Sequence, residues 1–179
     1  MLNKSNIEKI LDIIFKYPTA NFTIRELGRK AGISAPTAMN IIRSLKKEQI
    51  IKESKVATAS QISANLESEI YRRKKLVYNL EEIFSSNLIE YLVKIYRDPK
   101  AIILFGSYSK GYDIEKSDID IAVITEEKNK LDLDVFEKKL VRSISLHEIT
   151  LNKSSEEFKN NIYNGIVLRG ALWNHLIII

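Results

Sequence analysis

The sequence predicts an α/β (α+β) fold, with a helical front part, a helical connector and a small mixed sheet at the rear. Apolar residues recur at helical spacing through most of residues 5–97, whereas the continuous apolar run 101–105 is typical of a buried strand. Charge is also uneven. Residues 1–66 hold 11 Lys/Arg against 5 Asp/Glu (+6), residues 67–97 hold 6 against 5 (+1), and residues 98–179 hold 11 against 13 (−2), which together give the net charge of +5.

This division indicates modules with different partners. We expect a basic domain at residues 1–66, a connector at residues 67–84 and a second domain at residues 85–179. Nucleic acid is the natural partner of the basic domain.

Composition excludes several classes of function. The 179 residues contain no cysteine, which rules out disulfides, a thiolate metal site and a catalytic thiol, and two histidines leave little for a zinc site. The first residues lack the apolar stretch of a signal peptide, and no apolar run reaches membrane-spanning length. We therefore expect a cytoplasmic protein with no membrane partner.

The front domain reads as three helices and two strands. Helical spacing covers residues 5–17, and Ser5 with Glu8 three residues later is typical of a helix start. Thr23 and Gly32 bound a second helix at residues 24–31, and a third helix follows at residues 35–47. Residues 50–52 and 61–64 then read as paired strands.

The second and third helices, separated by a tight turn, resemble a helix-turn-helix, and the following strands resemble a wing. The third helix would then read double-stranded DNA. The candidates for base contacts are Ser34, Thr37 and Asn40, and those for phosphate contacts are Arg43, Lys46, Lys47, Lys52 and Lys55. The alternative is a winged helix that serves dimerisation or protein docking.

The connector lacks Pro and Gly from residue 66 to residue 97, and residues 85–87 (Ser-Ser-Asn) indicate a break with a new N-cap. We expect two helices there. The first would pair with its counterpart in a homodimer, and the second, residues 87–96, would pack on the rear sheet.

The rear domain carries the chemistry. The strand at residues 101–105 ends in Gly106-Ser107, and a short helical turn from Ser107 to Gly111 would present backbone N–H groups, a hydroxyl and Lys110 to an anion. A second strand starts at Asp118 and Asp120, whose side chains share one face about 7 Å apart. Two carboxylates this close favour bound cations, and oxygen ligands favour magnesium or manganese.

These motifs resemble the signature of the DNA polymerase beta-like nucleotidyltransferases, in particular the minimal nucleotidyltransferase type, over roughly residues 85–170. The matching residues are Gly106, Ser107, Gly111, Ser117, Asp118 and Asp120. The resemblance implies ATP as donor, two magnesium ions on the aspartates, and phosphates held by the Gly-Ser turn with Lys110, where the family often has arginine. The acceptor would be a hydroxyl of a small molecule or of a protein, as in antitoxins that modify a partner toxin.

The family usually places a third carboxylate on a later strand. After a covering helix at residues 133–141, residues 144–150 read as such a strand, and Glu148 is the best match if that strand runs opposite to the aspartate strand. His147 is the alternative occupant, although it and His175 also suit packing or surface positions. We expect Trp173 and residues 176–179 in the core or a dimer interface. A transcription regulator whose rear domain only binds nucleotide or dimerises is the competing function.

Overall fold

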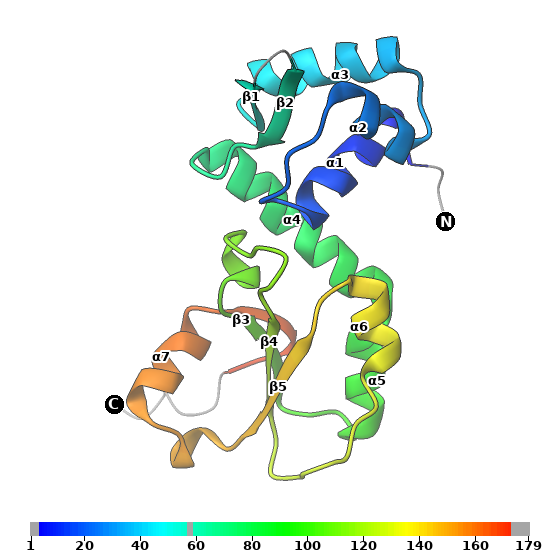
Figure 1. Ribbon diagram of the computed structural model, residues 1–179. Helices are drawn as coiled ribbons and strands as arrows, with labels where there is room; N and C mark the ends of the chain where they lie inside the picture. The colour runs from blue at the N-terminus through cyan, green and yellow to red at the C-terminus, as the bar shows by residue number, and fades with distance from the viewer. Residues whose placement is uncertain (1–3, 57–58, 173–179) are drawn as a thin grey trace. The chain divides into compact units, whose positions relative to one another are not determined.

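The computed structural model describes residues 4–56 and 59–172 (Figure 1). The chain forms two compact units, Met1–Lys75 and Leu76–Ile179. Trp173, His175 and residues 176–179, which were expected to be packing, core or interface residues, lie outside the described residues, as do residues 57–58 of the expected wing. Among the described helices, none is both long and apolar enough to cross a bilayer.

Three helices open the first unit, as the sequence predicts. They are α1 (Asn6–Lys16), α2 (Ile24–Ala31) and α3 (Ala35–Lys47). Capping boxes start the first two, because Ser5 and Thr23 each exchange hydrogen bonds with a glutamate three residues on. Gly32 ends α2 in the left-handed conformation, with φ of 65°.

An antiparallel hairpin completes this unit. It consists of β1 (Ile51–Val56) and β2 (Ala59–Ala64), with Ile51 opposite Ala64. Phe22, just before α2, exchanges backbone hydrogen bonds with Ile62 of β2 and so ties the helices to the hairpin. The core of the unit consists of apolar side chains from all three helices and both strands, among them Ile10, Ile14, Leu27, Ile42, Leu45, Ile51 and Ile62.

The connector forms α4 (Glu69–Ser86) and α5 (Leu88–Ile95), broken at Asn87 as predicted. The reason for the break differs from the expectation. Asn87 adopts a left-handed conformation, with φ of 65°, and its side chain makes no capping hydrogen bond within the described residues. The hydroxyl of Ser86 instead accepts a hydrogen bond from the Leu88 N–H at 3.1 Å.

A four-stranded mixed sheet forms the second unit, in the order β5-β4-β3-β6. Its strands are β3 (Ala101–Phe105), β4 (Ile119–Ile124), β5 (Ile144–Ile149) and β6 (Ile166–Gly170). β3 runs antiparallel to β4 and β6, whereas β4 and β5 are parallel. The condition under which Glu148 would lie beside the aspartates, a 144–150 strand that runs opposite to the aspartate strand, is therefore not met. Helix α6 (Asp134–Leu140) links the two strands, and a helical crossover returns the chain in the same direction.

Helices cover both faces of this sheet (Figure 1). One face carries Ile102, Leu104, Ile121 and Val123 and packs against α5, α6 and the end of α4. The other carries Ile103, Phe105 and Ala122 and packs against α7 (Glu156–Tyr163). These two faces decide where each candidate site residue lies.

Candidate active site

The Gly-Ser turn has the predicted form. β3 ends at Phe105, Gly106 follows with φ of 71°, and residues Tyr108–Lys110 form a 3-10 turn that Gly111 ends with φ of 70°. The Ser109 hydroxyl donates to the Gly106 carbonyl at 2.9 Å, and the Tyr112 N–H donates to the Ser107 carbonyl at 3.1 Å. These two hydrogen bonds stabilise the turn. The Lys110 side chain is exposed.

The two aspartates lie beside this turn. Asp120 in β4 pairs with Phe105 in β3, the residue before Gly106, while Asp118 directly precedes β4 and is exposed. A Cβ atom at position 106 would collide with Oδ2 of Asp120. The absence of a side chain at Gly106 therefore makes room for the Asp120 carboxylate against the turn.

The electrostatic environment of Asp120 is unfavourable for a lone carboxylate. Partial burial raises its pKa above the ordinary value, an electrostatic interaction with the nearby His147 imidazole opposes that shift, and the nearby Asp118 carboxylate adds to it. The fold therefore holds two mutually repelling acids at one place, which suits a site for cations.

His147 lies on the same face of the sheet as Asp120. In the parallel register Ser145 is the partner of Asp120, and His147 is the partner of Ala122, two residues further along. The Ser145 hydroxyl and Nε2 of His147 are 3.1 Å apart. The imidazole also lies between two aromatic rings, with centroids 5.4 Å from Phe105 and 5.3 Å from Phe158.

Glu148 projects from the opposite face, where its neighbour in the register is Val123. Its Oε1 accepts a hydrogen bond from the Tyr96 hydroxyl at 2.6 Å and another from the Asn129 N–H at 2.7 Å. Burial and the bond to Glu148 raise the pKa of Tyr96. Glu148 thus fastens α5 and the loop before α6 to the sheet, and this position does not fit the expected role of metal ligand or general base.

Ser117, another expected nucleotide contact, supports the loop before the aspartates. Its hydroxyl accepts a hydrogen bond from the Ile114 N–H at 2.9 Å.

A buried polar cluster, which was not predicted from the sequence, supports the Gly-Ser turn on its buried side. Asn79 of α4 donates through Nδ2 to the Tyr108 carbonyl at 2.9 Å and to Asp113 Oδ1 at 2.7 Å. Nη2 of Arg142 lies 3.9 Å from Oδ2 of Asp113, and all three polar side chains are buried. No local sequence pattern predicts such a cluster, because its members come from three separate segments.

The carboxylates of the site can be compared with the ligands that magnesium, the metal implied by the resemblance, requires. In residues 4–56 and 59–172, no group of three His, Asp or Glu side chains is arranged to hold an ion. Asp118 and Asp120 nevertheless provide two oxygen ligands whose mutual repulsion a divalent cation would relieve. The pair fits magnesium with water or phosphate oxygens as its remaining ligands.

Some of the residues expected to contact DNA form hydrogen bonds or ion pairs within the protein, and others are exposed. Ser34 caps α3 by accepting from the Thr37 N–H, and the two hydroxyls lie 2.8 Å apart. Lys46 pairs with Glu53 at 2.6 Å, and Lys52 pairs with Glu67 at 2.5 Å. The remaining candidates, Asn40, Arg43, Lys47 and Lys55, are exposed.

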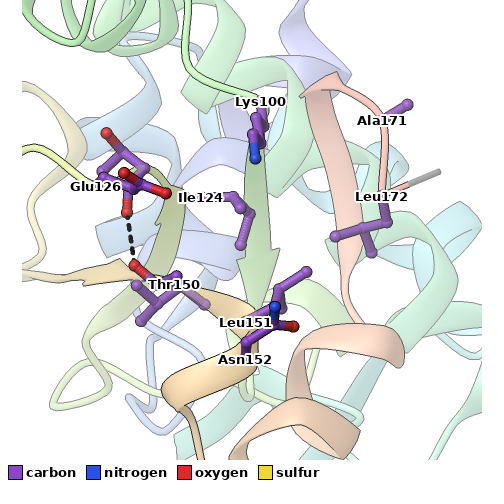
Figure 2. A pocket seen from close by; sticks show the side chains of 10 residues that line it. Lys100, Ile124, Glu126, Thr150, Leu151, Asn152, Ala171 and Leu172 are labelled. Atoms are coloured by element: carbon purple, nitrogen blue, oxygen red, sulfur yellow. Dashed lines mark hydrogen bonds between the residues drawn. The ribbon is translucent and has the colours of Figure 1, made fainter. Parts of the chain in front are cut away.

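A cavity of about 430 Å³ opens at the other end of the sheet (Figure 2). Lys100, just before β3, and Thr125 and Thr150, just after β4 and β5, contribute to its wall, and the Thr150 hydroxyl donates to the Thr125 carbonyl. Lys100 and Gly106 bracket β3, so they are about 20 Å apart. The cavity and the aspartate pair are therefore separate features.

Comparison with known proteins agrees with the geometry. Residues 86–170 match the model of the family described as "Polymerase beta, Nucleotidyltransferase". This segment contains the Gly-Ser turn, both aspartates and all four strands of the sheet. The rear part of the chain is therefore similar to nucleotidyltransferases over these residues, and this similarity favours a transferase-like function. No curated protein and no solved structure matches the chain.

Gly106→Ala should destabilise the protein by about 2 kcal/mol or more, because it adds a clash with Asp120 to the strain of a positive φ. Gly32→Ala is the matched control, since Gly32 has a similar φ but open space around the missing Cβ, and should cost about 1 kcal/mol. Urea unfolding measures both. Equal losses would contradict the close approach of Asp120 to the turn.

Asp120→Asn should raise the melting temperature at pH 7 in EDTA by about 1–3 °C. The folded-state pKa of Asp120 is raised, so its ionised form is disfavoured in the fold, and stability is lost as pH rises through the interval between the unfolded and folded pKa values. The gain should therefore vanish below the ordinary aspartate pKa. Asp118→Asn, at an exposed position, should have a smaller effect. A pH-independent gain would contradict this account.

Proposed function

We propose that this protein is a metal-dependent nucleotidyltransferase that moves a nucleoside monophosphate from ATP to a hydroxyl of a protein or small molecule. The observation that carries the proposal is the position of the Asp120 carboxylate against Gly106. It brings a carboxylate pair and a glycine turn suited to phosphates together inside the segment with nucleotidyltransferase similarity.

Each residue of the site then has a role. Asp118 and Asp120 would hold two magnesium ions, which when bound neutralise charge on the phosphates. The Gly106-Ser107 backbone and Lys110 would bind the β- and γ-phosphates. His147, on the same face as Asp120, would take the proton of the acceptor hydroxyl in place of the third carboxylate of the family.

The front unit supports a second part of the proposal, a winged helix that binds double-stranded DNA. Its three helices and hairpin follow the order of that motif, and α3 presents an exposed row of Pro36, Asn40, Arg43 and Lys47 at spacings of three and four residues. Because Lys46 and Lys52 are already paired with glutamates, Arg43 and Lys47 would provide the main phosphate contacts on this surface.

A DNA site and a nucleotide-dependent reaction would thus be joined in one cytoplasmic protein, as in an antitoxin that modifies its partner and regulates its own genes. This step rests on analogy between fused domains.

One observation favours a second candidate. The described part of the site has two carboxylates rather than three, since Glu148 faces the other side of the sheet. A regulator that binds ATP without turnover needs only the turn and a carboxylate pair able to hold a metal, and the described residues include both. Turnover of ATP decides between the two functions.

With ATP labelled at the α-phosphate, magnesium and cell lysate, the wild type should transfer label to an acceptor. Asp118→Asn and Asp120→Asn should each reduce transfer by about 100-fold or more, because each removes a charge that holds the metals. Glu148→Gln should keep transfer within about threefold once folding is confirmed, since this residue lies on the other face. Radiography of separated products provides the measurement.

ATP labelled at the γ-phosphate is the control, and with this label the protein should give no labelled acceptor beyond those in lysate alone. Equal labelling by the wild type and the Asp118→Asn plus Asp120→Asn variant would remove the proposed site. If calorimetry shows that the wild type binds ATP and no label is transferred, the nucleotide-binding regulator is the correct function.

Arg43→Ala and Lys47→Ala should each weaken binding to mixed-sequence duplex DNA by about 5- to 10-fold and reduce the slope of log K against log salt by about 1. Lys46→Ala is the matched control and should have less effect, because Glu53 already neutralises Lys46. Fluorescence anisotropy at several salt concentrations measures both quantities. Unchanged affinity in the double variant would mean that the α3 surface does not bind DNA.

A further inference from the structure

Helix α4 carries an apolar stripe on its exposed side. Ile70, Val77 and Phe84 are 44%, 65% and 47% exposed, and they recur at intervals of seven residues. Seven residues fall about 20° short of two full turns, so the three side chains lie almost in line along one helix face. Isolated exposed apolar residues are ordinary, but three large ones in line indicate a contact surface.

Charged residues flank the stripe, with positive charges on one side of Val77 and a negative charge on the other. Arg73 and Lys74 lie on the N-terminal side of Val77, and Glu81 lies on the C-terminal side, all of them exposed. Arg73 and Glu81 are each four residues from Val77, on opposite sides of it. In the part of the chain that the structure describes, neither side chain forms a hydrogen bond or ion pair.

This pattern is self-complementary about Val77. If two α4 helices cross antiparallel with their Val77 residues in contact, each Ile70 meets the partner's Phe84, and each Arg73 meets the partner's Glu81. Such reciprocal pairing is what a two-fold interface requires. A parallel arrangement would instead bring Arg73 next to the partner's Arg73, and Glu81 next to the partner's Glu81, which is unfavourable.

We propose that two copies of this chain form a two-fold dimer through antiparallel α4 helices centred on Val77. The apolar stripe supplies the affinity, and the two Arg73–Glu81 pairs select the direction. A contact between two helices of this length is smaller than a standard protein interface. We therefore expect a concentration-dependent dimer with a dissociation constant in the micromolar range, about 1–100 µM.

Sedimentation velocity of the full chain at about 1–200 µM tests the proposal. Val77→Asp should leave the chain monomeric over this range, because it places two carboxylates at the centre of the contact. Val135→Asp is the matched control, since Val135 on α6 is equally exposed at 68% but lies outside the stripe, and it should dimerise like the wild type. Circular dichroism checks that both variants remain folded.

A charge exchange tests the direction of the helices. Arg73→Glu and Glu81→Arg should each weaken dimerisation by about 10-fold, and the double variant should return to within about threefold of the wild type. Loss of dimerisation in the double variant would overturn the antiparallel arrangement. A wild type that stays monomeric at every concentration, or a Val77→Asp variant that dimerises normally, would overturn the interface itself and assign the stripe to another partner or to none. These outcomes do not depend on ATP, so they are separate from a failure of the proposed transferase activity.

Discussion

The contact between the Asp120 carboxylate and the backbone of Gly106 is the constraint on which the rear domain depends. The pairing of Phe105 with Asp120 brings the end of β3 to the start of β4, and only a residue without a side chain leaves room for the carboxylate there. The nearby Asp118 carboxylate makes the arrangement electrostatically costly. Repulsion of this kind at a tight turn favours a site for a charged ligand.

Local features of the chain could be predicted because they depend on neighbours in the sequence. The capping boxes at Ser5 and Thr23, the stop at Gly32 and the turn ending at Gly111 all follow from short-range stereochemistry, and the structure has each of them. The alternation of side chains along a strand predicts a shared face for Asp118 and Asp120, and the structure has Asp118 directly before β4 with Asp120 inside it. Similarity of residues 86–170 to nucleotidyltransferases agrees with this motif.

Features that depend on strand pairing were harder to predict. The direction of β5 decides which of its residues faces Asp120, and a parallel register brings His147 to that face and sends Glu148 to the other. A signal was present, because the predicted helix at residues 133–141 implies a crossover, and crossovers join parallel strands. The cluster of Asn79, Asp113 and Arg142 had no comparable signal, since only the tertiary fold brings these residues together.

That cluster also bears on how the protein can evolve. Asp113 and Arg142 are buried together, and loss of either one would remove a compensating charge from the other, at a cost of up to about 3–5 kcal/mol. This is a large fraction of the roughly 5–15 kcal/mol that stabilises a typical domain. A substitution at one of these positions should therefore be tolerated better when the other position changes as well. In diverged descendants, the presence of both residues would indicate that the Gly-Ser turn is retained even where the sequence motif of the turn has changed.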